Sequence, residues 1–403
     1  MNSCNKKIQA NEPFDFAIIG TGLAGLMLAV ALLENKPTAQ KKILLLDSSF
    51  DGYAPRTWCF WQAGTSKWDH LAEKSWTNVA FALGDKTLKK NLLPYSYNLI
   101  SSNRFREYAW SIIRKHGHVH AEEASVCSIT TIGNEQVIKT ADSTFRAHSV
   151  FDSRFEPQAL QHRAGHTLYQ QFVGHFVQAK QAIFDPSTAL LMDFTVPQSQ
   201  AVAFCYLLPT SAHTALVEYT LFTPSILPEH QLEQALERYI QEKFPEAEMT
   251  AIAREKGIIP MTDYQFTQPH RGIVPIGTAG GCSKPSTGYT FSFVCRHTEK
   301  IIQDINAGKM PRAYKEEVPT RFDFYDRIML AIMEKYPEKG AGLLFRLFQN
   351  NKVQDVLRFL DNQSTIGTEL SIFKSLPIGL FSKQAIQELL KSPCKLSKRN
   401  VDR

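Results

Sequence analysis

Three glycines near the start of the chain have the spacing of a loop that holds nucleotide phosphates. Gly20, Gly22 and Gly25 form a G-x-G-x-x-G pattern, which follows the apolar run FAII and precedes a longer apolar run. In such a loop the glycines allow a tight turn, close approach of a pyrophosphate and close helix–strand packing, respectively. A second apolar run ends at Asp47, where a carboxylate can accept a hydrogen bond from a ribose hydroxyl. The pattern predicts a dinucleotide-binding βαβ unit, and the alternative is a glycine-rich turn without a ligand.

A second glycine-rich segment lies at residues 271–302. An apolar strand is expected to end at Gly277, and a loop with Gly280 and Gly281 follows. The loop continues into Pro285, Ser286, Thr287 and Gly288. Proline in a first turn beside hydroxyl residues is typical of a helix start, so we expect this segment to open a helix. Its N-terminus can face an anionic or electron-rich ring, although an ordinary capped helix explains the pattern equally well.

The composition limits the classes of partner. The chain has 403 residues, a net charge of +6 and a pI near 8.8. This diffuse charge does not indicate nucleic acid, but it is compatible with an anionic membrane surface. The seven cysteines show no C-x-x-C and no histidine-rich partner spacing, so we expect free thiols in a reducing compartment and no metal site.

Membrane-spanning and secretion signals are not expected. The first residues, MNSCNKKIQANEP, contain no apolar segment of the kind found in signal peptides. The longest apolar run, 23–33, is too short to cross a bilayer and belongs to the βαβ unit. Any membrane association is therefore expected to be peripheral.

The elements that must position these residues follow from hydrophobic periodicity. Residues 51–103 read as irregular and aromatic, 104–116 as a helix, and 119–152 as a strand meander that ends at Asp152. Residues 166–265 alternate like strands and include one helical insert, HQLEQALERYIQEKF. Residues 320–391 have helical spacing throughout, with breaks at Pro337 and around Pro377. We therefore expect a nucleotide-binding domain, a sheet-based second domain and a helical C-terminal region.

Several motifs together resemble the flavin-dependent lycopene cyclases of the bacterial type. The matching pieces include GTGLAGLMLA at 20–29, RTWCFW at 56–61, FDPSTALLMDF at 184–194, KPSTGY at 284–289 and VLRFLDNQS at 356–364. The glycine motif alone is shared with many flavoproteins, but the other motifs together are typical of the cyclases. The resemblance runs from about residue 14 to about residue 380. Many flavin hydroxylases carry Gly-Asp where this chain has Gly277-Thr278, so the chain departs from the hydroxylase pattern here.

The resemblance implies an α/β, FAD-binding Rossmann-type flavoprotein fold with an interleaved sheet-based domain. The implied domains are a discontinuous FAD-binding domain (1–103, 119–165 and 266–310), a strand-rich substrate-binding domain (166–265) and a helical C-terminal region (311–403). The implied FAD contacts are Gly20, Gly22, Gly25, Asp47, Arg56, Asp152, Gly277, Gly280, Gly281, Ser286, Thr287 and Gly288. For Arg56, an ordinary surface position is the alternative.

The implied reaction is the non-redox cyclisation of the ends of lycopene to β-ionone rings, which gives β-carotene by way of γ-carotene. An enzyme of this kind is an isomerase, or intramolecular lyase. Protonation of a terminal double bond gives a tertiary cation, which a neighbouring double bond attacks before a proton is lost. The resemblance implies that FAD must be reduced, with NADPH as the reductant, and that no metal takes part.

Glu218 is the expected acid. In ALVEYTLF it lies on a predicted strand with Leu216 and Thr220 on its face, opposite Val217 and Tyr219. A lone glutamate on a strand is usually solvated or paired, but the resemblance aligns it with the first acid of a Leu-x-Glu-x-Thr motif. Where plant relatives carry a second acid this chain has Tyr219, which argues against a pair formed by neighbours in the sequence. A carboxyl among apolar walls would have a raised pKa and could act as an acid near neutral pH.

Aromatic and basic residues have both functional and structural explanations. Trp58, Phe60 and Trp61 are expected to line a substrate tunnel, with core packing as the alternative. Asp193 is expected to anchor an interface, and His213 is given no role. Because lycopene is a hydrocarbon, the protein is expected to be cytoplasmic and to bind peripherally to the inner face of the membrane. The candidate docking residues are Phe345, Phe348, Phe359, Lys391, Lys395, Lys398 and Arg399, which core packing and a solvated end explain as well.

Two other functions are compatible with the sequence. One is an FAD-dependent hydroxylase or reductase acting on a lipid or isoprenoid, which would change the mass of its substrate. The other is a carotenoid carrier with a degenerate nucleotide fold, which the intact glycines argue against.

Overall fold

The chain begins with the expected βαβ unit. The computed structural model describes residues 12–391 except 53, 156–159, 161–164, 199–200, 265 and 267–269. Strand β1 (Phe14–Ile19) runs into helix α1 (Leu23–Glu34), and β2 (Ile43–Asp47) returns parallel to β1. Gly22 is the residue immediately before α1, so the glycine motif lies at the N-terminus of this helix. The predicted strand–glycine loop–helix–strand order is confirmed.

The first sheet has the strand order β8-β2-β1-β11-β10-β9, with β17 beside β11. Its further strands are β8 (Val119–Glu123), β9 (Ser128–Ile132), β10 (Glu135–Lys139), β11 (Thr144–Asp152) and β17 (Ile273–Pro275). Strands β8, β2, β1, β11 and β17 run parallel, whereas β9, β10 and β11 form an antiparallel meander. The meander predicted within 119–152 is thus confirmed, and β8 contributes to the parallel part of the sheet.

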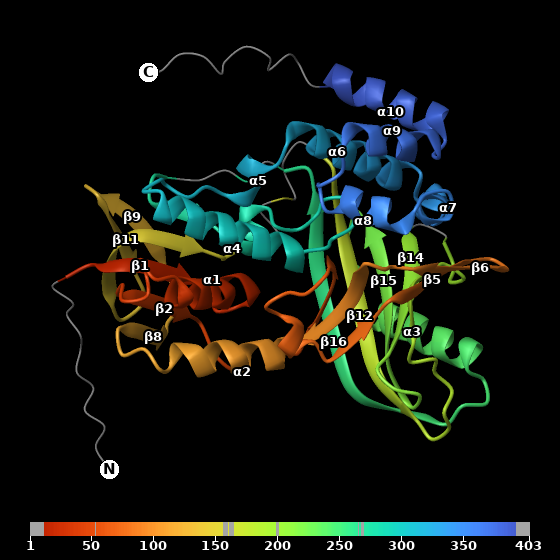
Figure 1. Cartoon of the computed structure of the whole chain (residues 1–403), viewed down its shortest axis with the longest axis horizontal. Coiled ribbons are helices and arrows are strands. Elements are labelled where there is room, and N and C mark those ends of the chain that lie inside the picture. The colour runs from red at the N-terminus through yellow and green to blue at the C-terminus, as the bar shows by residue number, and fades with distance from the viewer. Residues whose placement is uncertain are drawn as a thin grey trace.

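Helices cover one face of this sheet. α1, α2 (Ser102–Ile113) and α4 (Phe291–Asn306) share an apolar core with the residues of that face, and they lie side by side in Figure 1. Apolar residues of β1 and β2 on the opposite face pack with those of β10 and β11. Both faces of the parallel strands are therefore buried, which explains why β1 and β2 read as continuous apolar runs.

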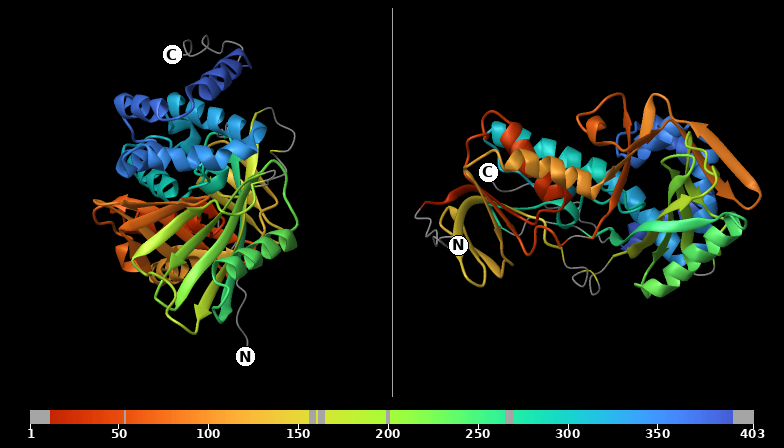
Figure 2. Two further views of the ribbon diagram at one scale, coloured as in Figure 1. Left: turned by 90° about the vertical axis from the view of Figure 1, so that its right-hand side faces the viewer. Right: turned by 90° about the horizontal axis from the view of Figure 1, so that it is seen from below.

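The second sheet is a separate, mostly antiparallel layer with the order β16-β12-β15-β14-β13-β5-β6. Its strands are β12 (Thr167–Ala179), β13 (Thr188–Asp193), β14 (Val202–Pro209), β15 (Thr214–Thr223), β16 (Met249–Thr262), β5 (Asn78–Leu83) and β6 (Lys86–Asn91). Helix α3 (Glu229–Lys243), the predicted helical insert, covers one face. The C-terminal helices pack against the other face, and Figure 2 shows this sheet between the two groups of helices.

Residues 51–103 differ from the expected irregular structure. They contain β5 and β6 and a small third sheet of β3 (Thr57–Ala63), β4 (Lys74–Trp76) and β7 (Tyr95–Ser101). The expectation failed because buried aromatic residues interrupt the polar–apolar alternation on which strand prediction depends. Because β5 pairs with β13, residues 78–91 belong to the second sheet, although the predicted FAD-binding domain took in all of 1–103.

The C-terminal region is helical, as expected. It contains α5 (Tyr314–Glu317), α6 (Thr320–Lys335), α7 (Pro337–Gln349), α8 (Val353–Leu360), α9 (Ile366–Lys374) and α10 (Ile378–Lys391). The breaks predicted at Pro337 and Pro377 are confirmed, since α7 starts at Pro337 and α10 starts directly after Pro377. Among the described residues, no helix has the length and apolar character needed to cross a membrane.

The aromatic residues proposed for docking lie inside the protein. Phe345 and Phe348 are each only 3% exposed in the core beneath the second sheet, and Phe359 is half-buried against that core. Lys391 is exposed, while Lys395, Lys398 and Arg399 lie outside the described residues. The prediction that Phe345 and Phe348 form an exposed patch was wrong, because helical periodicity does not reveal which face of a helix another layer covers.

Candidate active site

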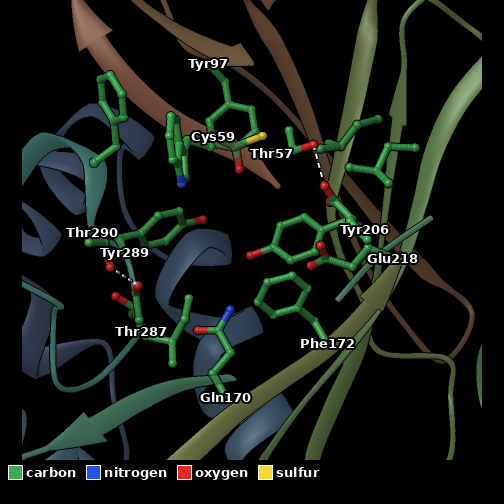
Figure 3. Close-up of a pocket in the computed structure, with 17 residues that line it drawn as sticks. Thr57, Cys59, Tyr97, Gln170, Phe172, Tyr206, Glu218, Thr287, Tyr289 and Thr290 are labelled. Atoms are coloured by element: carbon green, nitrogen blue, oxygen red, sulfur yellow. Dashed lines mark hydrogen bonds between the residues drawn. The ribbon is translucent and has the colours of Figure 1, made fainter. Parts of the chain in front are cut away.

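A cavity of about 100 Å³ lies between the second sheet, strand β3 and the loop that precedes α4. Aromatic side chains make up much of its wall. In Figure 3, Glu218, Tyr206 and Phe172 lie on one side, and Tyr289, Thr287 and Thr290 lie on the other. Among the described residues, no lysine or arginine lines the cavity, and its only carboxylic acids are Glu218 and Glu255.

Glu218 lies on β15 with the predicted orientation. Leu216 on the same strand lines the cavity with it, whereas Val217 and Tyr219 pack on the opposite face of the sheet with α3. The hydroxyl of Thr220 donates a hydrogen bond to Glu218 Oε1 at 2.8 Å. The predicted alternation of β15 is thus confirmed: Glu218 and Leu216 face the cavity, whereas Val217 and Tyr219 face α3.

A second carboxyl group reaches the same point from a different strand. Gly174 on β12 pairs with Glu218 of β15 on one side and with Glu255 of β16 on the other. Adjacent strands lie about 4.8 Å apart, so the two glutamates flank a position that has no side chain. A Cβ atom on Gly174 would lie 3.1 Å from Glu255 Cγ and 3.4 Å from Glu218 Cβ. Glycine therefore leaves the space above β12 in which the two carboxyl groups meet.

The surroundings of this pair favour protonation. Burial raises the pKa of Glu218 well above its usual value, and the neighbouring Glu255 raises it further. Burial also raises the pKa of Glu255, but the hydroxyl of Thr57, 2.6 Å from Oε2, acts in the opposite direction. The interaction between them raises the pKa of Glu218 and lowers that of Glu255, so of the two carboxyl groups Glu218 is the more easily protonated.

Tyrosine hydroxyls form much of the remaining polar part of the cavity wall. Burial raises the pKa of Tyr289 to about 12 and raises those of Tyr97 and Tyr206 well above their usual value. The Cys59 thiol, also in the wall, has a pKa raised by burial and by the nearby glutamates. These groups stay neutral over the physiological pH range, so they offer aromatic faces and neutral hydrogen-bond donors rather than charge.

The N-terminal glycine loop has the geometry of a phosphate-binding turn. Gly20 has a φ of 91°, which favours glycine, and a Cβ on Gly25 would lie 1.9 Å from the carbonyl oxygen of Gly20. A Cβ on Gly22 would meet no protein atom within 4 Å. Gly20 and Gly25 are thus required by the fold itself, whereas Gly22 leaves free the space in front of the helix N-terminus.

Two predicted cofactor contacts also take part in interactions within the protein. Asp47 Oδ2 accepts hydrogen bonds from the backbone N–H and the hydroxyl of Thr21, which join β2 to the glycine loop. Asp152 lies beside Ile19 at the carboxyl end of the sheet, where its carboxylate is paired with Arg154 at 2.7 Å. Both acids therefore lie beside the loop, as expected.

Arg56 is exposed and lies at the start of β3. Burial, Thr57 and Glu218 change the pKa of Glu255 most, and the charge of Arg56 lowers it as well. Arg56 thus lies within electrostatic reach of Glu255 but does not line the cavity.

The loop at 277–290 differs from the expected helix start. Gly277 and Gly280 form a single 3-10 turn, Gly281 follows with a φ of 78°, and α4 starts only at Phe291. Residues 285–288 form a tight turn instead, closed by hydrogen bonds of Lys284 to Tyr289 and Gly288. The prediction that this segment opens a helix was wrong because Gly288, with a φ of 72°, turns the backbone out of the helical region.

A buried ion pair fixes this turn to the C-terminal helices. Lys284, 2% exposed, is 2.8 Å from Asp326 of α6 and also donates to Asn362 Oδ1 at 2.7 Å. Ser286 donates to Asp326 Oδ1, one of the two carboxylate oxygens that Lys284 contacts, at 2.7 Å. Ser286 is thus an anchor of the turn, and Thr287 and Gly288 are the residues that reach the cavity.

Besides Glu255, two residues at the cavity have a buried polar atom without a partner among the described residues. Thr287 Oγ1 and Gln170 Oε1 form no hydrogen bond among the described residues, although both are inaccessible to solvent. A Cβ on Gly288 would lie 1.9 Å from Gln170 Oε1, so the turn and β12 already touch at this point. Unpaired buried polar atoms beside a glycine turn fit a planar ligand with polar edges, such as a flavin ring.

Of the three predicted tunnel aromatics, one lines the cavity. Trp58 lines the cavity, but Phe60 is buried against Phe291 with ring centroids 4.2 Å apart. Trp61 is buried as well and donates its indole N–H to Asp361 at 2.6 Å. Phe60 and Trp61 thus pack in the core, which was the alternative explanation for this cluster.

Sequence reasoning did not find Glu255, Gln170 or Tyr289. Glu255 lies in the run AREKG, which resembles a solvated strand edge, and its neighbours Arg254 and Lys256 are indeed exposed. Only the register with Gly174 reveals that this single residue of the run turns inward. Tyr289 follows the recognised KPSTG segment directly, so its position next to that turn was an available signal.

Other sequence expectations concern residues away from the cavity. Asp193 is fully buried and binds Tyr239 and Lys243, which join α3 to the second sheet. No cluster of three or more potential metal ligands occurs in the part of the chain that the structure describes.

Comparisons with known proteins place this geometry in a family. The family model described as "Lycopene cyclase protein" matches residues 15–385. This chain belongs to the lycopene cyclase family. The lycopene beta-cyclase of Pseudescherichia vulneris is 25% identical over 310 residues, which is 74% of this chain and 75% of the relative. The lycopene beta-cyclase of Pantoea ananas is 24% identical over 299 residues, or 72% of this chain and 74% of the relative.

Solved structures share the fold at low sequence identity. A geranylgeranyl bacteriochlorophyll reductase-like protein from Thermoplasma acidophilum has a TM-score of 0.64 at 12% identity, covering 94% of this chain and 99% of that chain. A flavin-dependent brominase has a TM-score of 0.59 at 13% identity, covering 94% of this chain and 100% of that chain. A halogenase solved in complex with phloroglucinol and FAD has a TM-score of 0.55 at 12% identity, covering 94% and 93%. The family member described here therefore has the α/β flavoprotein fold.

Proposed function

We propose that this protein cyclises the ends of lycopene to β-ionone rings, using Glu218 as the proton donor. The observation that carries the proposal is a buried carboxyl group with a raised pKa in an aromatic cavity, in a chain of the lycopene cyclase family. Ring closure needs an acid, a dry pocket and stabilisation of a carbocation, and the cavity walls offer all of these. Since the reaction only rearranges bonds, we class the enzyme as an isomerase.

Glu218 is suited to give up a proton and take one back. Burial keeps its carboxyl protonated near neutral pH, so the proton is present when the alkene arrives. After transfer, the carboxylate remains beside the cation and can accept the proton lost on ring closure. The same residue thus serves as acid and base, and no proton from outside is consumed.

The aromatic walls stabilise positive charge without reacting with it. Phe172, Tyr206 and Trp58 line the cavity around Glu218, and the high pKa of Tyr206 keeps its hydroxyl un-ionised. A cation over an aromatic face gains about 0.5–2 kcal/mol, more when water is absent. Neutral phenols and thiols are also much weaker nucleophiles than a phenolate or a thiolate, which could capture the cation.

We propose FAD as the cofactor, held by the glycine loop at its pyrophosphate and by the 284–290 turn at its ring. Three features support the fit: the open space at Gly22, the unpaired polar atoms Thr287 Oγ1 and Gln170 Oε1, and the fold shared with FAD-dependent proteins. Reduced FAD bound there supplies negative charge close to the carbocation without net oxidation of the substrate. NADPH is the proposed reductant, and the free thiols among the described cysteines agree with a reducing, cytoplasmic setting.

We also propose peripheral binding to the inner face of the membrane through α9 and α10. Six apolar side chains on these helices are exposed: Ile366, Leu370, Ile378, Ile386, Leu389 and Leu390. Lys374, Lys383 and Lys391 are exposed nearby, whereas the only acids of these helices, Glu369 and Glu388, are buried and paired. Apolar side chains flanked by exposed lysines, of which Lys391 is paired with Glu388, are suited to an anionic bilayer, from which lycopene must be drawn. We call this set of exposed residues the α9–α10 surface.

Product mass tests the proposed function. The purified protein is incubated with lycopene in anionic liposomes, FAD and NADPH, in parallel with and without oxygen, and the masses of the separated products are measured by mass spectrometry. We expect products with the mass of lycopene and the absorption of ring-closed carotenes. An added oxygen or added hydrogens would instead favour the flavin hydroxylase or reductase, the chemistry of several proteins with this fold.

A further inference from the structure

Glu255 shares its setting with Glu218 although the two residues are 37 positions apart in the chain. It is 5% exposed on a strand whose neighbouring residues, from Thr250 to Lys256, are otherwise exposed. Its Oε2 accepts the hydroxyl of Thr57, while Oε1 is buried and lacks a hydrogen-bond partner of normal geometry among the described residues. Burying an ionised carboxylate is costly when one of its oxygens has no hydrogen-bond partner. A proton shared between the carboxyl groups of Glu255 and Glu218 is therefore favoured.

The pair exists because of the strand register. Glu255, Gly174, Glu218 and Tyr206 form one row across β16, β12, β15 and β14, and the row faces the cavity. Any side chain at the second position would separate the carboxyl groups. The carboxyl pair therefore depends on the pairing of three strands, β16, β12 and β15, and no local sequence motif encodes it.

We propose that Glu218 and Glu255 act as a carboxyl pair that holds one proton, with Glu255 keeping that proton on Glu218 until the alkene accepts it. This inference rests on the proposed function and names the positioning residue of its acid. The proton leaves Glu218 and forms a C–H bond with the terminal alkene carbon. Ring closure forms a C–C bond, a ring C–H bond then breaks, and its proton returns to Glu218. No electrons are gained or lost.

Glu255 contributes at two stages of this cycle. Before transfer, its negative charge disfavours ionisation of Glu218, so the acid stays loaded at neutral pH. After transfer, two carboxylates face the carbocation, and the attraction between unlike charges in a dry cavity offsets the repulsion between them. Removing the charge of Glu255 should therefore lower the cyclisation rate most at the pH values at which Glu218 stays protonated only because of that charge.

The test is the pH dependence of cyclisation by Glu255→Gln, loaded with reduced FAD. Cyclisation needs protonated Glu218, so the rate falls as pH rises through its raised pKa. Removing the Glu255 charge lowers that pKa, and the fall should move to lower pH by about one unit or more. At low pH we expect the variant to cyclise lycopene at a rate near that of the unmutated protein. Above the shifted pKa its rate should be lower by at least about tenfold, because a pKa shift of one unit changes the protonated fraction of Glu218 tenfold there. An equal loss at every pH would indicate a merely structural role and overturn the proposal.

Neighbouring groups do not confuse this profile. The groups that face the pair are Arg56, Cys59, Tyr97, Tyr206 and Tyr289, and the thiol and phenols have raised pKa values. They therefore stay un-ionised over the range in which the carboxyls titrate. Glu229→Gln is the matched control, because it removes an exposed carboxyl that pairs with Lys256, the residue next to Glu255. Its profile should match that of the unmutated protein.

Infrared spectroscopy of the lycopene-free protein separates this inference from the proposed function. The C=O band of a protonated carboxyl should be present at pH 7, absent in Glu218→Gln, and lost at lower pH in Glu255→Gln. Should Glu255→Gln not fold, Gly174→Ala pushes a methyl group between the carboxyls and should move the titration the same way, by less. A band that is absent from the start, or that titrates unchanged in these variants, would overturn the pair even if lycopene is cyclised.

Discussion

Gly288 and Gln170 touch at the junction of the cofactor turn and the second sheet. A Cβ atom on Gly288 would lie 1.9 Å from Gln170 Oε1. The φ of Gly288 is 72°, which is unfavourable for residues other than glycine. The side chain of Gln170 is only 7% exposed, so it can move aside only into the cavity. The position of the Gln170 side chain on β12 therefore determines how much space the proposed flavin ring has.

This contact leads to the first prediction. Gly288→Ala should weaken FAD binding by about tenfold or more, because the displaced amide occupies the ring site and the backbone is strained by about 1 kcal/mol. Flavin fluorescence on titration with FAD measures the change. The double variant Gly288→Ala with Gln170→Ala should recover part of the loss, since the clash is then gone although the proposed contact of Gln170 Oε1 with the ring is lost as well. If the double variant binds no better than the single one, the turn does not border the flavin.

The second prediction concerns the glycine loop. Gly22→Val should leave the thermal stability of the flavin-free protein nearly unchanged, since a Cβ there meets no protein atom, but should abolish FAD retention. Gly25→Val is the contrasting control. Its side chain would collide with the Gly20 carbonyl, 1.9 Å from the new Cβ, so it should lower the melting temperature whether or not FAD is present. A Gly22→Val protein that still purifies with bound flavin would contradict the assignment of this loop.

The third prediction concerns the acid. Glu218→Gln keeps the shape of the side chain but removes its transferable proton, so cyclisation should fall by about 10²- to 10⁴-fold. FAD binding and folding should be unchanged, because Thr220 can still donate to the amide oxygen. The unmutated enzyme should lose activity as pH rises through the raised pKa of Glu218. Activity of the variant within a few-fold of the unmutated level would assign the proton to another group.

The fourth prediction concerns the α9–α10 surface. Leu389→Ser with Leu390→Ser should reduce flotation with anionic liposomes, because these side chains are 61% and 80% exposed. Lys383→Glu should reduce it further and lower its sensitivity to salt, since each basic residue near anionic lipid contributes about 1 kcal/mol. Ile132→Ser is the control, as Ile132 is 63% exposed on β9 of the first sheet. Equal losses with the Ile132 variant would mean that flotation does not report on α9 and α10.

The sequence predicts those parts of the fold and of the site that depend on residues close together in the chain. The loop at Gly20–Gly25 and the strand face of Glu218 follow from short-range patterns, because a glycine spacing and an alternation of period two fix them directly. Glu255 was missed because its burial depends on strand register between β12 and β16, which the run AREKG does not reveal. The turn at 285–288 was taken for a helix start because the positive φ of Gly288 is a property of the folded backbone. The predicted docking role of Phe345 and Phe348 was wrong for a similar reason, since these side chains are buried where the C-terminal helices pack against the second sheet.

The most direct test of the account compares rings formed with electrons consumed. FAD is reduced beforehand in an anaerobic vessel, lycopene is supplied in liposomes, and ring-closed product and NADPH oxidation are followed together. A cyclase whose flavin stays reduced should form many rings per flavin while oxidising almost no NADPH, and oxidised FAD without NADPH or any other reductant should give no product. One NADPH oxidised for each product molecule, or full activity with oxidised FAD in the absence of any reductant, would contradict a redox-neutral cyclisation that depends on reduced flavin.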